Sequence, residues 1–295
     1  MNAARAVEIV VVTARMTTWP APPNLYAMKI DDLRIAKGSS IRLAKMSTDA
    51  TLGLADKAAA LAELAKIQPD ITELQTRLHA EGKRGVLMVI QAMDAGGKDG
   101  AVRGLHGALN PTGVRVVSFK VPVGRETEQD YLWRVHNECP RKGEIVLFNR
   151  SHYEDVLVVR VREFVAAEQW KKRYQHIANF EQMLSDEGTE IIKIFLHISK
   201  EEQRVRQQER VDIPKKNWKF RAGDLEDRAR WDDYMAAYQD AINKTSTPDA
   251  PWYVVPADRK WVRDVAVATI LLEHLKEIDP QYPPNPGVVP GMKVV

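Results

Sequence analysis

The sequence predicts an α/β fold in which a parallel five-stranded sheet is flanked by helices on both faces, in three layers. From residue 85 onward, short apolar runs of strand length alternate with longer segments whose apolar residues recur at helical spacing. The strand-length runs are apolar throughout, which is typical of strands covered on both faces and therefore of a parallel sheet. With 295 residues, 44% of them hydrophobic, the chain is long enough to bury one large core.

Each element follows from its own pattern. The five predicted strands cover 86–91, 114–120, 144–149, 191–198 and 252–256. The predicted helices that follow the first strand cover 100–109, 127–138, 171–184, 201–210, 225–244 and 261–275. An earlier helix is predicted over 55–80, where apolar residues recur every three or four positions from Leu61 to Leu78. Because Pro69 lacks a backbone N–H, this segment is either one helix or a pair of helices broken there.

The two ends of the chain differ from its middle. Residues 1–30 include the proline-rich stretch 19–24, and proline removes a donor and clashes inside a helix. We therefore expect residues 1–30 to form an extended or disordered extension. Residues 31–280 are expected to form a single domain, and residues 281–295, which contain several prolines, an extended tail.

A loop of small residues and a lysine follows the first predicted strand. Residues 92–98 read AMDAGGK, a near match to the phosphate-binding pattern G-x-x-x-x-G-K-[ST]. Small residues let backbone N–H groups approach phosphate oxygens, Lys98 adds a positive charge, and the next helix begins there. The candidate phosphate-binding residues around Lys98 are Ala95, Gly96, Gly97, Asp99 and Gly100. The alternative is a glycine-rich strand-to-helix turn that binds nothing.

This loop departs from the pattern at two positions. Ala92 replaces the first glycine, and Asp99 stands where Ser or Thr would bind Mg²⁺. A carboxylate inside the loop, Asp94, is the candidate substitute as metal ligand.

Polar residues also follow the third predicted strand. Asn149 and Arg150 lie at its carboxyl end, and ligands bind at that edge in open α/β sheets. Arg150 suits bidentate phosphate recognition, and the alternative for it is a surface salt bridge. His152 is better explained as a hydrogen-bonded structural residue than as a catalytic one, because phosphoryl transfer between acidic phosphates needs little general-base help.

A basic segment lies between the fourth and fifth predicted strands. Its cations include Arg204, Arg210, Lys215 and Lys219. In small-molecule kinases a mobile lid that closes over the phosphates occupies this place, so we predict a helical lid over about 204–224. The alternative is a solvated basic surface, which is the usual meaning of a run of charges.

Composition narrows the class of protein further. The net charge of only +3 gives no indication of nucleic-acid binding. The single cysteine, Cys139, excludes an intramolecular disulfide and makes a cytoplasmic location the default expectation. No apolar run approaches the length that spans a membrane, so no membrane partner is expected.

Four motifs together resemble the polyphosphate kinase family 2, and the resemblance runs from about residue 31 to residue 280. They are QAMDAGGKDG, FNRSHYEDVLVVRV, RVDIPKKNWKF and APWYVVPADRKW, and the stretch FNRSHYEDVLV resembles in particular the third subgroup of the family. The resemblance implies a P-loop kinase fold and transfer of phosphoryl groups between inorganic polyphosphate and nucleotides. The implied acceptors are AMP and ADP, with guanine nucleotides as further candidates. It also implies Mg²⁺ as cofactor, with Mn²⁺ as a substitute, and a homo-oligomer, in particular a tetramer.

The resemblance also carries residue roles. Asp94 and Lys98 fall on the catalytic aspartate and lysine of the loop, with Asp94 as the metal ligand, and Arg150 falls on the phosphate-binding arginine. Asn149 falls where other subgroups carry an aspartate. Arg204, Arg210 and the stretch 215–219 fall within the lid, with Arg210 as a further catalytic residue.

Two other functions remain open from sequence. The first is an ATP-dependent small-molecule or nucleotide kinase that does not use polyphosphate. The second is a non-enzymatic nucleotide or phosphate sensor with a degenerate loop, against which the presence of Asp94 and Lys98 argues.

Overall fold

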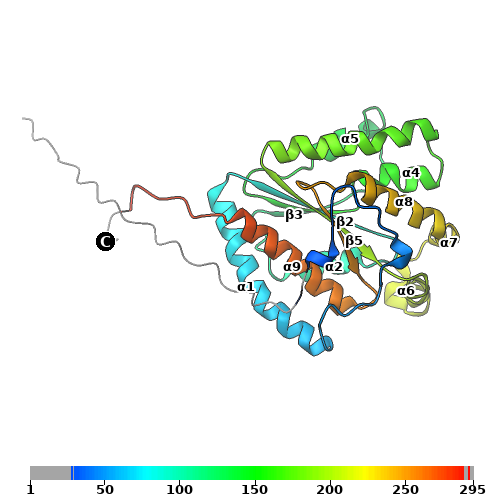
Figure 1. Cartoon of the computed structure of the whole chain (residues 1–295), viewed down its shortest axis with the longest axis horizontal. Helices are drawn as coiled ribbons and strands as arrows, with labels where there is room; N and C mark the ends of the chain where they lie inside the picture. Colours follow the sequence, from blue (N-terminus) through cyan, green and yellow to red (C-terminus); the bar gives the residue numbers. More distant parts are fainter. Residues whose placement is uncertain (1–27, 29, 289–291, 293–295) are drawn as a thin grey trace, which may run out of the picture.

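A computed structural model describes residues 28, 30–288 and 292, which build a six-stranded sheet between two layers of helices (Figure 1). The strands are β1 (Arg34–Ile35), β2 (Gly85–Ala92), β3 (Val114–Ser118), β4 (Ile145–Asn149), β5 (Thr189–His197) and β6 (Trp252–Pro256). Their order across the sheet is β1-β6-β5-β2-β4-β3. The non-consecutive neighbours require crossovers, and the helices make them.

Five of these strands are parallel, as predicted. Strand β2 lies at the centre and pairs with β4 on one side and β5 on the other, while β3 and β6 extend the two sides. The sixth strand was not predicted. Strand β1 is only two residues long and pairs antiparallel with β6, with Ile35 opposite Trp252. Two residues are too few to show a strand period in sequence.

The helices are α1 (Lys57–Glu81), α2 (Lys98–His106), α3 (Trp133–His136), α4 (Val158–Val161), α5 (Ala167–Asp186), α6 (Lys200–Asp212), α7 (Gly223–Ala229), α8 (Trp231–Thr245) and α9 (Lys260–Ile278). In Figure 1, α1, α2 and α9 lie together on one face of the sheet, and α4, α5 and α8 lie on the other. Every residue of β2 is buried, which explains its continuous apolar run. The hydrophobic core therefore lies on both faces of the central strand.

Helix α1 settles a question that the sequence left open. It runs unbroken from Lys57 to Glu81 through Pro69. Asp56 caps its start, accepting a hydrogen bond from the backbone of Ala59, and Gly82 ends it in the left-handed region with φ of 63°. The segment is one helix rather than a pair.

Two predicted helices were wrong in extent. In place of a helix over 127–138, the chain forms a 3-10 helix, Gly124–Thr127, and the one-turn helix α3. The carboxylate of Asp130 accepts hydrogen bonds from the backbone of Leu132 and Trp133, so it starts a new turn instead of continuing a helix. The helix predicted over 225–244 is divided into α7 and α8 at Arg230, which has a non-helical ψ of 26°.

The ends of the chain are described only in part. The extension predicted over 1–30 lies outside the described residues except for Met28 and Ile30, whose side chains are buried. The tail predicted over 281–295 is described at 281–288 and 292, and the stretch 281–288 contains no helix or strand.

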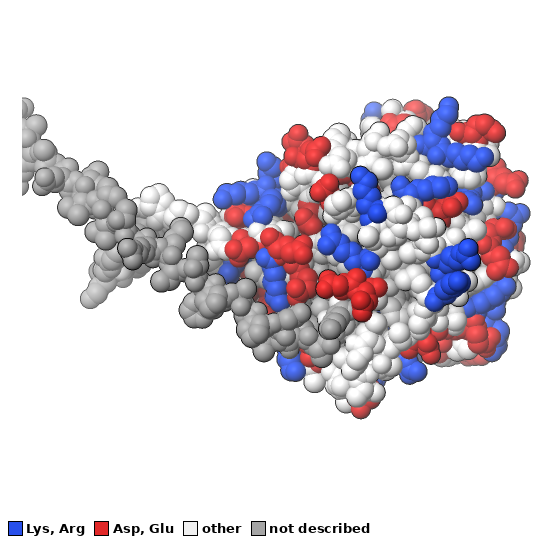
Figure 2. Space-filling model, viewed as in Figure 1, with Lys and Arg blue, Asp and Glu red and all other residues white. Residues whose placement is uncertain are grey.

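Two further properties bear on the surface. Among the described residues, no helix combines the length and the apolar character that a membrane crossing requires. On the face shown in Figure 2, Lys and Arg side chains are interspersed with Asp and Glu rather than gathered into one field of a single sign.

Candidate active site

The loop between β2 and α2 has a backbone that small residues can follow. Gly97 has a φ of 100°, and a Cβ at this position would collide with the guanidinium of Arg263. A Cβ at Gly96 would lie 2.7 Å from the carbonyl oxygen of Met93. A left-handed φ and a close approach both favour glycine. The loop thus leads directly into the N-terminus of α2, the arrangement in which P-loops bind phosphate.

Lys98 is the first residue of α2, and its side chain is folded back over the loop. The ammonium donates hydrogen bonds to the carbonyl oxygens of Ala92 at 2.9 Å and Met93 at 3.3 Å. Only 8% of the residue is exposed. Burial, with the nearby charge of Arg150, lowers the pKa of Lys98 to about 8.

Asp94 and Arg210 form an ion pair across the loop. Nη1 of Arg210, on α6, donates to Oδ2 of Asp94 at 2.8 Å and to Oδ2 of Asp224 at 3.0 Å. Burial alone would raise the pKa of Asp94, but the charges of Arg210 and Lys98 outweigh it, so the pKa is lowered. Asp94 is therefore a carboxylate at neutral pH.

The carboxyl end of β4 meets the start of α2. The side-chain amide of Asn149 donates to Oδ1 of Asp99 at 2.8 Å. Nζ of Lys219, from the 3-10 helix Pro214–Lys219, lies 3.7 Å from the other oxygen of Asp99. Asp99 thus links strand β4, helix α2 and the predicted lid.

Arg150 has an unusual backbone conformation. Its φ is 65°, in the left-handed region, which costs an arginine on the order of 1–3 kcal/mol and persists only where the surroundings fix it. Nη1 lies 3.4 Å from Oε2 of Glu154, and the side chain is 45% exposed. Its guanidinium therefore has a carboxylate on one side and solvent on the other.

These residues line one cleft of about 2640 Å³. The predicted site residues that line it are Asp94, Ala95, Gly96, Gly97, Lys98, Asp99, Gly100, Asn149, Arg150, Arg210 and Lys219. Arg204 and Lys215 are not among the lining residues. Arg204 instead pairs with Glu201 at 2.6 Å on an exposed face of α6, so its geometry gives no support to a phosphate-binding role.

Comparison with known proteins identifies the family of this chain. A family model described as Polyphosphate kinase 2 (PPK2) matches residues 54–283, most of the chain. The chain belongs to the polyphosphate kinase 2 family. The predictions of this family and of a polyphosphate kinase enzyme are therefore confirmed.

Relatives support the same assignment over most of the chain. The chain is 59% identical over 227 residues to an AMP/ADP-polyphosphate phosphotransferase from Meiothermus ruber, covering 77% of this chain and 85% of the relative. It is 41% identical over 269 residues to an ADP-polyphosphate phosphotransferase from Rhodopseudomonas palustris, covering 87% and 93%. The crystal structure of polyphosphate kinase 2 from Arthrobacter aurescens TC1 matches with a TM-score of 0.86 at 41% identity, covering 90% of this chain and 95% of that chain. The prediction of an α/β P-loop kinase fold is thereby confirmed.

Sequence reasoning missed several residues that hold the loop in place, among them Arg206, Arg263 and Tyr238. Nη1 of Arg206 donates to the carbonyl oxygen of Ala95 at 3.2 Å, and Nη1 of Arg263 donates to that of Gly97 at 3.2 Å. The hydroxyl of Tyr238 donates to the carbonyl oxygen of Ala92 at 2.8 Å. A signal existed for Arg206 alone, because it lies four residues before Arg210 and so shares its helix face.

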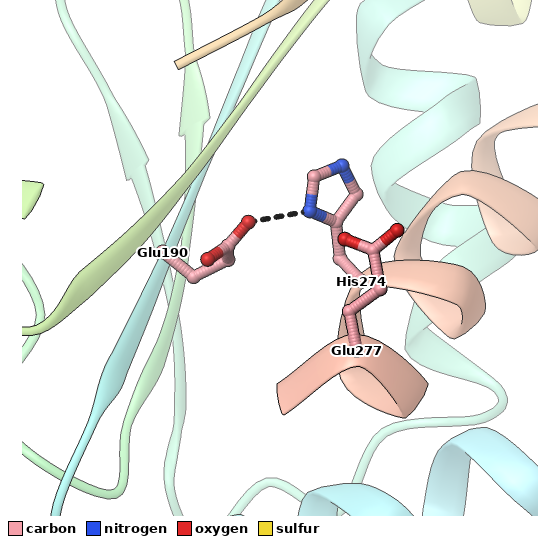
Figure 3. Close-up of side chains that lie close together, drawn as sticks. All are labelled: Glu190, His274 and Glu277. Atoms are coloured by element: carbon pink, nitrogen blue, oxygen red, sulfur yellow. Dashed lines mark hydrogen bonds and ion pairs between the residues drawn. The ribbon is translucent and has the colours of Figure 1, made fainter. Parts of the chain in front are cut away.

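A group of three potential metal ligands lies outside the cleft. Within the described residues, Glu190 on β5 and His274 and Glu277 on α9 bring their ligand atoms within 4.8 Å of one another (Figure 3). Nδ1 of His274 lies 2.6 Å from Oε1 of Glu190, and its Nε2 lies 2.9 Å from the hydroxyl of Tyr253. Both ring nitrogens of His274 therefore already have partners. These hydrogen bonds connect β5, β6 and α9, which gives the three residues a structural role.

Proposed function

We propose that this polyphosphate kinase 2 transfers phosphoryl groups between inorganic polyphosphate and adenine nucleotides, making ADP from AMP and ATP from ADP. The observation that supports it best is the meeting of Lys98, Asp94, Arg150 and Arg210 in one cleft. At about 2640 Å³, that cleft exceeds the roughly 300–1,000 Å³ of an ordinary small-molecule site, so it has room for two phosphate-bearing substrates together. The relative from Meiothermus ruber, named for both AMP and ADP, supports the acceptor range.

The residues suit a reaction that depends on position and charge. A transferring phosphoryl group needs its attacking and leaving oxygens held in line and its negative charge stabilised. Lys98 and the backbone of the loop hold the phosphates of one substrate at the N-terminus of α2. Arg150 approaches the same phosphates from the end of β4, where a planar guanidinium binds two oxygens at once. Arg210 closes the third side from α6.

The oxygen ligands that the cleft offers fit a magnesium ion that is held mainly by the substrate. Mg²⁺ is bound in such sites by one or two carboxylates together with phosphate oxygens and water. Asp94 is the ionised carboxylate that the loop offers, and Asn149 adds a neutral oxygen in place of a second carboxylate. When bound, Mg²⁺, or Mn²⁺ as its substitute, neutralises phosphate charge. Arg210 lies 2.8 Å from Oδ2 of Asp94 and 3.5 Å from Oδ1, so Oδ1 is the oxygen that it holds less closely.

One assay tests the proposal. The purified protein is given Mg²⁺, polyphosphate and each of AMP, ADP, GMP and GDP, and the products are separated by chromatography. We expect ADP from AMP and ATP from ADP, each in proportion to the polyphosphate added. Transfer from ATP to an acceptor without any use of polyphosphate would contradict the proposal and favour an ATP-dependent kinase.

The assembly of the protein is a separate proposal. The family resemblance implies a homo-oligomer, expected as a tetramer, in the cytoplasm. Sedimentation of the purified protein at several concentrations tests the tetramer, and a single species of monomer mass would contradict it.

A further inference from the structure

Beneath the turn that carries Arg150 lies a fully buried group of polar side chains. Its members are Lys193 on β5, Glu181 on α5, and His152 and Tyr153 in the 3-10 helix His152–Val156 that follows β4. Each is at most 1% exposed, and none of the four is among the residues that line the cleft. We refer to these four residues as the buried quartet. The roles argued above leave it without a function.

The carboxylate of Glu181 is the centre of the quartet. Its Oε2 accepts from Nζ of Lys193 at 2.5 Å, and its Oε1 accepts from the hydroxyl of Tyr153 at 2.9 Å. Nε2 of His152 lies 3.2 Å from the same Oε1. Burial alone would raise the pKa of Glu181, but Lys193 and His152 outweigh it and lower the pKa. The carboxylate is thus charged and is approached by three donors from two other elements.

The buried quartet is connected to Arg150 through the main chain. His152 and Tyr153 follow Arg150 by two and three residues, and the hydroxyl of Ser151 accepts from the backbone N–H of Tyr153 at 3.1 Å. The backbone N–H of Arg150 itself donates to the carbonyl oxygen of Ile90 on β2 at 3.2 Å. The left-handed turn at Arg150 is therefore held by β2 before it and by the quartet after it.

A second ion pair fastens the other end of the same 3-10 helix. Oδ1 of Asp155 accepts from Nη1 of Arg173 on α5 at 2.7 Å. Helix α5 thus holds the segment 152–155 at two points, through Glu181 and through Arg173. Because a buried ion pair is satisfied in few arrangements, these contacts leave the segment little freedom to shift.

We propose that the buried quartet positions Arg150 for phosphate binding, which makes Glu181, Lys193, His152 and Tyr153 positioning residues for phosphoryl transfer. The proposal rests on the proposed function, because it assigns Arg150 to the transferred phosphate. A misplacement of about 1 Å in such a group can cost on the order of a hundredfold in rate. The competing explanation is that the quartet only holds α5 against the sheet.

A double-mutant cycle separates the two explanations. Tyr153→Phe removes one hydroxyl and keeps the ring that packs edge-on against Trp252, with centroids 4.8 Å apart. We expect it to lower kcat/KM about tenfold in the wild-type background and not at all in an Arg150→Ala background. Equal losses in the two backgrounds would show that the effect does not pass through Arg150, and the proposal would be wrong.

Tyr253→Phe is the matched control. It too removes one buried tyrosine hydroxyl, but this hydroxyl is bonded to Nε2 of His274 and lies on β6, outside the cleft. We expect its kcat/KM to stay within about twofold of wild type. A loss as large as that of Tyr153→Phe would mean that any buried hydroxyl matters equally, which would overturn the proposal.

A binding cycle keeps this inference distinguishable from the proposed function. The dissociation constant for a short inorganic polyphosphate is measured for the same four proteins of the Tyr153 and Arg150 cycle. If the wild type transfers no phosphoryl group, the proposed function fails. The binding cycle still decides the inference, because Tyr153→Phe should weaken polyphosphate binding in the wild-type background and not in the Arg150→Ala background.

A second pair of variants serves if Tyr153→Phe does not fold. His152→Gln keeps a donor for Glu181, and His152→Leu does not. We expect the Leu variant to lose affinity and the Gln variant to keep it, and equal behaviour of the two would contradict the proposal.

Discussion

Lys98 and Asp94 place one cation and one anion at the loop between β2 and α2, and both line the cleft. In phosphoryl transfer such fixed charges act mainly on the transition state, where charge on the phosphate oxygens is redistributed. We expect Lys98→Ala and Asp94→Asn each to lower kcat about a hundredfold, equivalent to about 3 kcal/mol of barrier. Circular dichroism should show an intact fold in both. Near-normal turnover in either folded variant would remove the loop from the mechanism.

The lowered pKa of Lys98, about 8, gives a pH dependence with a definite sign. The ammonium keeps its proton below that value and loses it as the pH rises through it. We expect the affinity for inorganic polyphosphate to be highest below about pH 8 and to fall above it, since a neutral amine no longer attracts phosphate. Titration calorimetry between pH 7 and pH 9 measures this fall. If the affinity of Lys98→Ala falls equally over this pH range, the titrating group is not Lys98.

Asn149 lies in the cleft beside the carboxylate of Asp99. Its amide donates to Asp99, and an aspartate at 149 would place a second carboxylate there with no donor between them. We expect Asn149→Asp to change the ratio of the rates with AMP and ADP, because added negative charge repels the more highly charged acceptor more strongly. The unfolding free energy should change by less than about 1 kcal/mol, since the substitution removes no packing. An unchanged ratio would exclude Asn149 from the acceptor site.

At the scale of elements, helix α6 presents two arginines to different surroundings. Arg210 contacts Asp94 and Asp224, whereas Arg204 pairs with Glu201 on the exposed face. If the segment 204–224 closes over substrate, polyphosphate and nucleotide should slow hydrogen exchange over about 210–223. We expect Arg210→Ala to abolish this protection and Arg204→Ala, its matched control, to keep it. Unchanged exchange in the wild type would indicate a static basic surface instead of a lid.

The sequence predicted the elements whose signals are local. Strand β2 and its loop were found because a buried apolar run, two glycines and Lys98 are contiguous, and Arg150 was found because it follows a strand. Arg263 was not found, since its contact with Gly97 depends on how α9 packs beside α2. The helix predicted over 127–138 was wrong because periodicity does not register a carboxylate, here Asp130, that starts a new turn.

At the scale of the whole molecule, the salt dependence of polyphosphate binding tests how the Lys and Arg side chains that line the cleft act together. The net charge is only +3, and the face in Figure 2 mixes both signs, so no broad basic surface is available there. We expect the logarithm of the affinity to fall linearly with the logarithm of salt concentration, as for other polyanions. Arg150→Ala should reduce the slope by about 1, because one ion contact is lost. A slope unaffected by Arg150→Ala would place the polyphosphate elsewhere.

The Arg210 guanidinium forms ion pairs with two carboxylates, Asp94 in the loop and Asp224 at the start of α7. In the proposed role of Arg210, an arriving phosphate competes with these two carboxylates for the guanidinium. Part of the interaction energy is consumed in this exchange, so a measured dissociation constant understates the strength of the contact itself. If Arg210 binds phosphate as proposed, the measured affinity is a difference between two sets of ion pairs, one internal and one with substrate. Weak contacts with phosphate and a strong internal ion pair would both give a high dissociation constant. A variant at Asp224 removes one internal partner of Arg210 and so distinguishes the two causes.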